Sequence, residues 1–236
     1  LVRGSKPIMW SPVERTALAE AEVEYHDRKV PVIWVKFPAV GFGHSEDWTA
    51  EQRAKIKEFL NVYAELVDGS NPPKIKAASV VIWTTTPWTI PANQAVCFNP
   101  AISYGLYEVE AVMSEEELGF KPFATVGERL ILADALAESV MDSAKIAGFR
   151  RLADVPPEFL QTFTLQHPLA SLSNFYKHDI PMLAGDHVTD DAGTGFVHTA
   201  PAHGEDDFLV WIASGHTASD IRDIVNEDGV YEHPDL

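Results

Sequence analysis

Cysteine and positive charge are both scarce in this chain of 236 residues. Its single cysteine, Cys97, excludes an internal disulfide framework and any metal site built from several cysteines, as expected in a reducing compartment. Lysine and arginine number 18 against 35 aspartates and glutamates, which gives a formal net charge of −17. Because lysine and arginine supply most non-specific affinity for phosphates, this balance argues against a general nucleic-acid binder. Any contact with nucleic acid is therefore expected to be local and weak.

Long hydrophobic runs are also missing. No stretch approaches the roughly 20 apolar residues that span a bilayer, and the opening Leu1-Val2-Arg3-Gly4-Ser5-Lys6 lacks the apolar core of a signal peptide. We therefore expect a soluble, cytoplasmic protein with no membrane partner. The chain begins with leucine rather than methionine, which suggests a piece of a longer protein. Hydrophobic residues still make up 46% of the chain, enough for one large domain with appendages.

Two segments have the periodicity of helices. Residues 49–67 begin with Thr49 and Gln52 as a candidate capping box. One face of this segment is apolar and carries Ile56, Phe59, Leu60, Tyr63, Leu66 and Val67. We expect this helix to cover a core, and it carries no obvious chemistry. A second helix is predicted at about 133–146, with Gly148 as its C-terminal stop.

Strand signals are more numerous than helix signals. The run from Val30 to Phe37 is rich in β-branched and aromatic residues and is expected to end at Pro38. Further strands are predicted at 77–83, 103–112, 159–166 and 195–199. The regular strand-helix alternation of a doubly wound sheet is absent, as is any internal repeat. The predicted fold class is mainly β with peripheral helices, an α+β domain that is barrel-like.

The first segment with chemical potential runs from Trp83 to Asn93. Two prolines stop the preceding strand, so four threonines and an asparagine are gathered on a stiff turn. Hydroxyl and amide groups both donate and accept hydrogen bonds, so such a loop can hold an ester carbonyl, a ribose hydroxyl and an attacking water. From composition alone, the commoner explanation is a β-edge turn whose threonines cap backbone groups.

The second segment, residues 193–208, places two histidines and three carboxylates within ten residues. His198 and His203 are five residues apart with a proline between them, which is poor spacing for a helical zinc site, so no metal is expected. No lysine-serine or helix signature follows the opening glycine-threonine-glycine, which argues against a phosphate-binding loop. The ordinary alternatives are a structural histidine at 203 and helix N-terminal charges at Asp206 and Asp207.

Together, and in this order, the two segments resemble the large editing insertion of the isoleucine, valine and leucine tRNA synthetases. The resemblance covers nearly the whole chain, including the stretch from Trp10 to Tyr25. The threonine run and the sequence His198-Thr199-Ala200-Pro201 look like the isoleucine enzymes. The valine and leucine enzymes have an arginine in the threonine-rich motif, and none occurs between residues 84 and 93 here. Ala202 stands where glycine is commoner in the isoleucine family, a departure of one methyl group.

The resemblance implies a domain that hydrolyses the ester joining valine to the 3′ end of tRNA(Ile). In such a domain Asp207 would bind the substrate α-ammonium, while His198 and Trp83 would line the side-chain pocket. The groups that would orient ester, ribose and water are Thr84, Thr85, Thr86 and Thr89, with Asn93 in support. No cofactor is implied, because an aminoacyl ester is already activated. The general base is left open between His198 and a water polarised by the substrate's ribose hydroxyl.

The same resemblance implies three parts. Residues 1–30 would be a connecting arm, 31–208 the editing domain, and 209–236 a C-terminal part with the return arm, the arms joining a catalytic body of the same synthetase. Neither a His-Ile-Gly-His-type motif nor a Lys-Met-Ser-Lys loop occurs, so the chain is not expected to activate amino acids. We expect a monomer. Two other functions remain open: a deacylase for another aminoacyl ester, and a non-catalytic module that binds the tRNA 3′ end.

Overall fold

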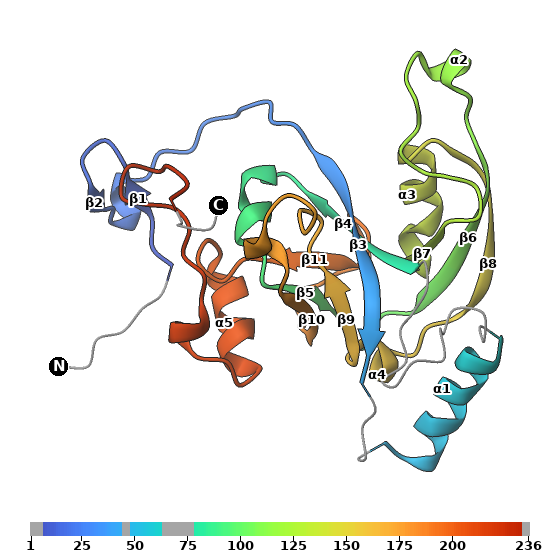
Figure 1. Cartoon of the computed structure of the whole chain (residues 1–236). Helices are drawn as coiled ribbons and strands as arrows, with labels where there is room; N and C mark the ends of the chain where they lie inside the picture. The colour runs from blue at the N-terminus through green and yellow to red at the C-terminus, as the bar shows by residue number, and fades with distance from the viewer. Residues whose placement is uncertain (1–6, 44–47, 63–77, 233–236) are drawn as a thin grey trace.

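A mixed sheet of nine strands organises the computed structural model, which describes residues 7–43, 48–62 and 78–232. The strand order is β11-β5-β10-β9-β3-β4-β7-β6-β8 (Figure 1). The bounds are β3 (Ile33–Phe42), β4 (Ala78–Thr84), β5 (Ala95–Phe98), β6 (Tyr104–Val112), β7 (Arg129–Ala133), β8 (Ile146–Asp154), β9 (Phe163–Gln166), β10 (Asp179–Ala184) and β11 (Phe196–Thr199). Two short strands, β1 (Trp10–Ser11) and β2 (Thr16–Ala17), pair only with each other among the described strands.

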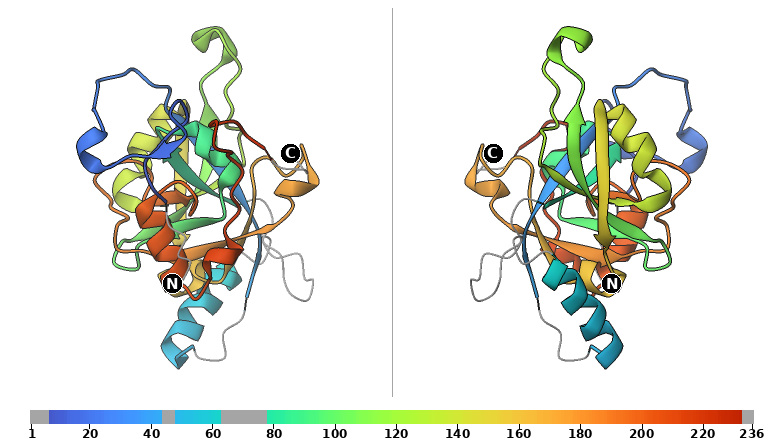
Figure 2. Two further views of the ribbon diagram at one scale, coloured as in Figure 1. Left: turned by 90° about the vertical axis from the view of Figure 1, so that its left-hand side faces the viewer. Right: turned by 90° about the vertical axis from the view of Figure 1, so that its right-hand side faces the viewer.

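Short helices lie around this sheet (Figure 2). The α-helices are α1 (Ala50–Val62), α2 (Glu115–Leu118), α3 (Ala137–Ser143), α4 (Pro157–Leu160) and α5 (Glu205–Ala213). The 3-10 turns are η1 (Glu20–Glu22), η3 (Pro87–Ala92), η4 (Asp134–Leu136), η5 (Asn174–Tyr176) and η6 (Ala218–Asp220). The predicted class, mainly β with peripheral helices, is confirmed.

The sheet is strongly curled, so that its edge strand β11 packs against β4, a strand near the middle of the sheet. β11 lies beside β4 although the two strands are not paired. The backbone N–H of Ala133, at the end of β7, donates to the carbonyl oxygen of Thr194 at 3.0 Å, just before β11 begins. At the other edge, β8 pairs only with β6 among the described strands. The barrel-like form is thus that of a curled sheet, because the described strands do not close into a barrel.

The first predicted helix is confirmed as α1. Its N-terminus has the predicted capping box, with the Thr49 N–H donating to Gln52 Oε1 at 2.8 Å and the Gln52 N–H donating to Thr49 Oγ1 at 3.2 Å. Ile56 and Phe59 are buried, so this face covers the core as expected. The part of the prediction beyond Val62 lies outside the described residues.

Two predicted boundaries are wrong for identifiable reasons. β3 does not end at Pro38, because β3 changes partner there: residues 33–38 pair with β4 and residues 39–42 pair with β9. A proline is tolerated where the ladder is interrupted in this way. The second helix is shorter than predicted, because Lys145, with φ of 62°, ends the helical path before Gly148, which lies inside β8.

Of the remaining predicted strands, three agree with the structure and one agrees only in part. Strands expected at 77–83, 103–112 and 195–199 correspond to β4, β6 and β11. The first half of the strand expected at 159–166 is taken by α4 and the turn after it, and β9 occupies the second half. α5 runs across the predicted boundary between residues 208 and 209, and its Trp211 is buried.

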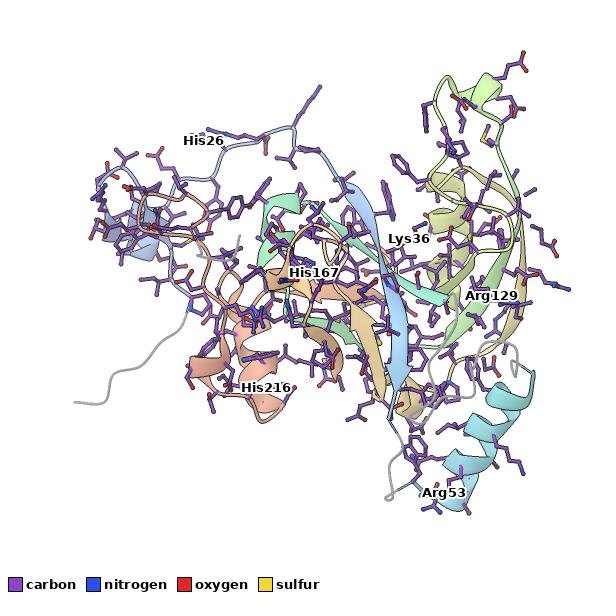
Figure 3. The ribbon with its side chains drawn as sticks, in the orientation of Figure 1. His26, Lys36, Arg53, Arg129, His167 and His216 are labelled. Atoms are coloured by element: carbon purple, nitrogen blue, oxygen red, sulfur yellow. The ribbon has the colours of Figure 1, made fainter. Side chains whose placement is uncertain are left out.

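A buried histidine joins the end of β9 to the η3 turn. Nε2 of His167 donates to the Ile90 carbonyl oxygen at 3.0 Å, and Nδ1 accepts the Leu169 backbone N–H at 3.1 Å. The ring, whose place Figure 3 marks, stacks on Tyr176 with 4.7 Å between centroids. Because both nitrogens are used by a neutral ring, protonation would set an N–H against the Leu169 N–H. Burial lowers the pKa of His167 to about 4.

This lowered pKa predicts acid sensitivity of the fold. Between about pH 6.5 and 4, the unfolded chain takes up a proton at His167 while the folded chain does not. The free energy of unfolding should therefore fall as the pH falls through this range, by up to about 1.4 kcal/mol per pH unit from this residue. Urea unfolding of His167→Gln should show a shallower slope against pH, whereas the exposed His26→Gln should keep the wild-type slope. Equal slopes in all three proteins would contradict the assignment.

Candidate functional site

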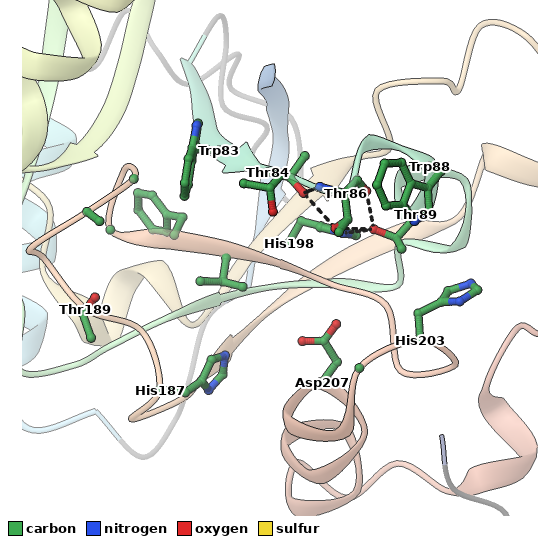
Figure 4. Close-up of a pocket in the computed structure, with 17 residues that line it drawn as sticks. Trp83, Thr84, Thr86, Trp88, Thr89, His187, Thr189, His198, His203 and Asp207 are labelled. Atoms are coloured by element: carbon green, nitrogen blue, oxygen red, sulfur yellow. Dashed lines mark hydrogen bonds between the residues drawn. The ribbon is translucent and has the colours of Figure 1, made fainter. Parts of the chain in front are cut away.

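A cavity of about 580 Å³ lies where β4, β11 and α5 approach one another (Figure 4). It brings together both segments that the sequence singled out. The predicted residues that line it are Trp83, Thr84, Thr85, Thr86, Thr89, His198 and Asp207. Asn93 does not line the cavity but contacts His198 from behind its wall. Residues more than 100 positions apart in the chain therefore share one site.

The threonine loop, residues 84–89, is folded on its own hydroxyls. Thr84 is the last residue of β4, and its Oγ1 accepts a hydrogen bond from the backbone N–H of Thr86 at 3.0 Å. The side-chain oxygens of Thr84 and Thr86 lie 3.2 Å apart. Pro87, with φ already fixed, then starts η3. Within that turn, Thr89 Oγ1 donates to the Thr86 carbonyl oxygen at 2.8 Å. The loop is thus both the capped edge turn suggested by composition and a set of hydroxyls facing a cavity.

A chain of hydrogen bonds joins this loop to β11. Asn93 Nδ2 donates to the Ala95 carbonyl oxygen at 2.8 Å and lies 3.1 Å from His198 Nδ1. Reversing the Asn93 amide would set its oxygen against that carbonyl oxygen, so the amide nitrogen is the donor to His198. His198 Nε2 lies 2.7 Å from Thr89 Oγ1. Since Thr89 uses its own proton toward Thr86, His198 must donate through Nε2.

These contacts define the state of His198. The residue is 7% exposed, and burial lowers the pKa of its imidazole to about 4. With Nδ1 accepting from Asn93 and Nε2 donating to Thr89, neither nitrogen keeps a lone pair for a water molecule in this arrangement. His198 therefore holds the threonine loop against β11 and lines the cavity. A role as general base would require these hydrogen bonds to break.

Asp207 enters the cavity from the first turn of α5. Its Oδ2 accepts the Ala200 backbone N–H at 2.8 Å, which fixes the carboxylate against the end of β11. A Cβ at Gly204 would come within 2.9 Å of the Asp207 carboxyl carbon, so a larger residue there would displace the carboxylate. Desolvation by burial raises the pKa of Asp207, so the carboxylate lacks the hydration of a surface group. Such a group favours a cationic partner.

The glycines before β11 have a structural explanation. Gly195 has φ of +79°, and a Cβ at that position would lie 2.2 Å from the Cβ of Ala133. Gly193 has φ of +80° and passes the Trp83 ring, to which its Cβ would come within 3.5 Å. The motif therefore lets the chain cross the ends of β7 and β4 closely enough to form the cavity wall.

Several lining residues were missed by sequence reasoning. These are Trp88, His187, Thr189, Ala192, Gly193, Gly195, Phe196, Val197, His203 and Gly204. His187 lies near Asp207 (Figure 4) although no motif connects the two in the sequence. Trp88 sits inside the threonine motif, and its place between two prolines was the available signal. No lysine or arginine is among the described residues that line the cavity.

Across residues 7–43, 48–62 and 78–232, no group of three or more His, Cys, Asp or Glu side chains is placed to hold a metal ion. Within the same ranges, every helix is too short or too polar to cross a membrane.

Curated relatives cover almost the whole chain. It is 52% identical over 231 residues to the isoleucine–tRNA ligase of Caulobacter vibrioides, which is 98% of this chain and 20% of that protein. It is 44% identical over 214 residues to the isoleucine–tRNA ligase of Bradyrhizobium diazoefficiens, which is 91% of this chain and 18% of that protein. The chain thus spans about a fifth of the length of these relatives. No protein-family model matches it.

A solved structure shows the fold independently of the sequence relatives. The crystal structure of GlLeuRS-CP1 superposes with a TM-score of 0.52 at 18% identity, over 81% of this chain and 63% of that one. The editing domain of the P. falciparum cytosolic leucyl-tRNA synthetase gives a TM-score of 0.48 at 12% identity, over 83% and 76% of the two chains. By sequence this chain is a segment that belongs to the isoleucine–tRNA ligase family, and its fold is that of the CP1 editing domains.

Proposed function

We propose that the domain hydrolyses the ester of valyl-tRNA(Ile), as the editing module of an isoleucyl-tRNA synthetase. One observation carries the proposal: a single cavity holds a desolvated carboxylate from α5 and a row of threonine hydroxyls from the loop after β4. An aminoacyl ester presents an ammonium next to an ester carbonyl and a ribose. The carboxylate can bind the ammonium, and the threonine hydroxyls can form hydrogen bonds with the ester carbonyl and the ribose.

In the proposed complex, Asp207 binds the α-ammonium through the oxygen that Ala200 leaves free. The hydroxyls of Thr84, Thr85 and Thr86 orient the ester, the ribose and the attacking water. The water oxygen adds to the ester carbonyl carbon and the bond from that carbon to the ribose oxygen breaks. The ribose oxygen takes up the proton that the water gives up, which leaves free valine and a ribose hydroxyl. Because both nitrogens of His198 are occupied, we favour the ribose hydroxyl next to the ester as the group that polarises the water.

The need for such a module follows from the small energetic value of one methylene. A hydrophobic pocket separates substrates that differ by a methylene by only about 1 to 3 kcal/mol, a limit for which the isoleucine enzymes are the standard example. A synthesis site that accepts isoleucine therefore also accepts some valine. A second pocket that excludes isoleucine by size removes the product of that error. We assign this size limit to His198, with Trp83 as a second residue that lines the same cavity.

The proposal includes partners and a setting. The substrate partner is the 3′ end of tRNA(Ile) carrying valine, and residues 1–30 and 209–236 connect the domain to the catalytic body of the same synthetase. We place the activity in the cytoplasm, in a monomer, without a cofactor. The alternatives are a deacylase for another aminoacyl ester and a module that only binds the tRNA end. Release of free valine from mischarged tRNA separates the proposal from both alternatives.

The first test removes the charge of Asp207. Asp207→Asn keeps an oxygen for the Ala200 N–H but removes the charge that binds the ammonium. Losing one member of such a pair costs roughly 2 to 5 kcal/mol, so valine release should slow by about 30-fold to several thousand-fold. The exposed neighbour Asp206→Asn is the matched control and should change the rate little. A folded Asp207→Asn protein with near-normal activity would refute this assignment.

The size limit is tested by shortening the side chain at position 198. His198→Ala removes the imidazole and should admit the extra methylene of isoleucine, so the ratio of valyl-tRNA to isoleucyl-tRNA hydrolysis should fall, by roughly tenfold. Thr89→Val removes the hydroxyl that His198 contacts but leaves the ring in place. That variant should slow both reactions and keep their ratio. An unchanged ratio in His198→Ala, measured beside a thermal melt, would remove His198 from the discriminating role.

The acidic balance predicts weak binding of the tRNA by the domain alone. With a net charge of −17 and no cation on the described cavity wall, little phosphate affinity is available. The dissociation constant for tRNA at physiological salt should lie above about 1 μM, and valyl-tRNA hydrolysis should be far less efficient than in the full-length enzyme. Submicromolar binding would show that the domain itself carries the tRNA recognition.

A further inference from the structure

Residues 218–232, here called the C-terminal segment, pack behind the wall of the cavity. In Figures 1 and 2 this segment passes beside the η3 turn. Its first contact is with Gln94, whose Nε2 donates to the Asp220 carbonyl oxygen at 2.8 Å and whose Oε1 accepts the Arg222 N–H at 2.6 Å. Gln94 is buried and directly follows Asn93, the residue that orients His198.

The second contact is apolar. Ile224 is fully buried, in a small core separate from the main one. This core also contains Ala92, Ala170, Phe175, Tyr176 and Ala200. Ala92 is the last residue of η3, and Ala200 donates its N–H to Asp207. The C-terminal segment therefore shares one core with both halves of the site.

The third contact is a hydrogen bond to the threonine loop itself. The Tyr231 hydroxyl donates to the carbonyl oxygen of Trp88, inside η3. A small hairpin presents this hydroxyl: the Asn226 N–H donates to the Val230 carbonyl oxygen at 2.9 Å and the Glu232 N–H to the Ile224 carbonyl oxygen at 2.8 Å. The side chain of Tyr231 thus reaches the loop from a defined turn.

The same hairpin also holds the N-terminal stretch. The Trp10 indole N–H donates to the Glu227 carbonyl oxygen at 2.8 Å, and Arg15 forms ion pairs with Glu227 at 3.1 Å and Asp228 at 2.5 Å. Exposed ion pairs of this kind contribute little to stability. Their position matters more. The same hairpin contacts the threonine loop through Tyr231 and contacts Trp10 and Arg15 through Glu227 and Asp228.

We propose that the C-terminal segment positions the threonine loop, with Gln94 and Tyr231 as positioning residues, and that it links residues 10–15 to the cavity. The inference rests on the proposed function, since its kinetic effect is on ester hydrolysis. Neither residue contacts the substrate in this account. Each instead fixes backbone that carries Thr86, Thr89 or Asn93, and a small displacement of such groups is enough to slow a reaction that depends on positioning.

The test uses Tyr231→Phe, which removes only the hydroxyl, and Gln94→Met, which removes the two contacts with the segment at similar volume. Tyr25→Phe, at a tyrosine 83% exposed on the N-terminal stretch, is the matched control. Two quantities are measured: hydrogen exchange of the Thr89 and Asn93 amides, which donate to Thr86 and Ile90 within η3, and steady-state valine release. Exchange at amides of β6 and the melting temperature report on the whole fold.

In both variants we expect faster exchange at Thr89 and Asn93 relative to β6, and a kcat lowered by about twofold to tenfold with a smaller change in KM. The Tyr25→Phe protein should match the wild type. Wild-type exchange and wild-type kcat in both variants would overturn the inference, and so would acceleration that is equal in η3 and β6. If the wild-type domain releases no valine, the proposed function fails, while the exchange data still decide whether the segment holds the loop.

Discussion

The hydrogen-bond chain from Asn93 through His198 to Thr89 is the interaction on which the cavity depends. It joins β11 to the loop after β4 inside a buried region, where an unpaired polar group costs about 1 to 3 kcal/mol. Each member has one role fixed by its neighbour, so the imidazole is neutral and its proton lies on Nε2. Burial lowers the pKa of His198, and the nearby His167 and His203 lower it further.

The curled sheet is what brings the partners of that chain together. β11 pairs with β5 and lies beside β4, so a residue in β11 faces a loop that leaves β4. The close crossing at Gly195 and Ala133 leaves no room for a side chain. Asp207 then reaches the same cavity because α5 begins soon after β11 ends. One constraint of packing thus sets the positions of the carboxylate, the imidazole and the hydroxyls.

Local chemistry was readable from the sequence where neighbours along the chain decide the structure. The capping box at Thr49 and Gln52, the stop imposed by the prolines after Thr86, and the chemical content of both motifs belong to this class. What needed the structure was pairing between distant strands. No local signal shows that Pro38 lies where β3 changes partner, that His187 lies near Asp207, or that Ile224 shares a core with Ala92. The resemblance to known synthetases identified the family, but not the hydrogen bonds that hold the site.

In the proposed complex, the ammonium of the substrate lies on Asp207 while its ester lies on the threonine loop. A structure of the domain with an amide-linked, non-hydrolysable analogue of valyl-adenosine tests this most directly. We expect the analogue in the cavity, its ammonium within hydrogen-bond distance of the Asp207 carboxylate, its linking carbonyl beside Thr84, Thr85 or Thr86, and its isopropyl group against His198. An analogue bound elsewhere, or bound in the cavity with its ammonium away from Asp207, would contradict the account.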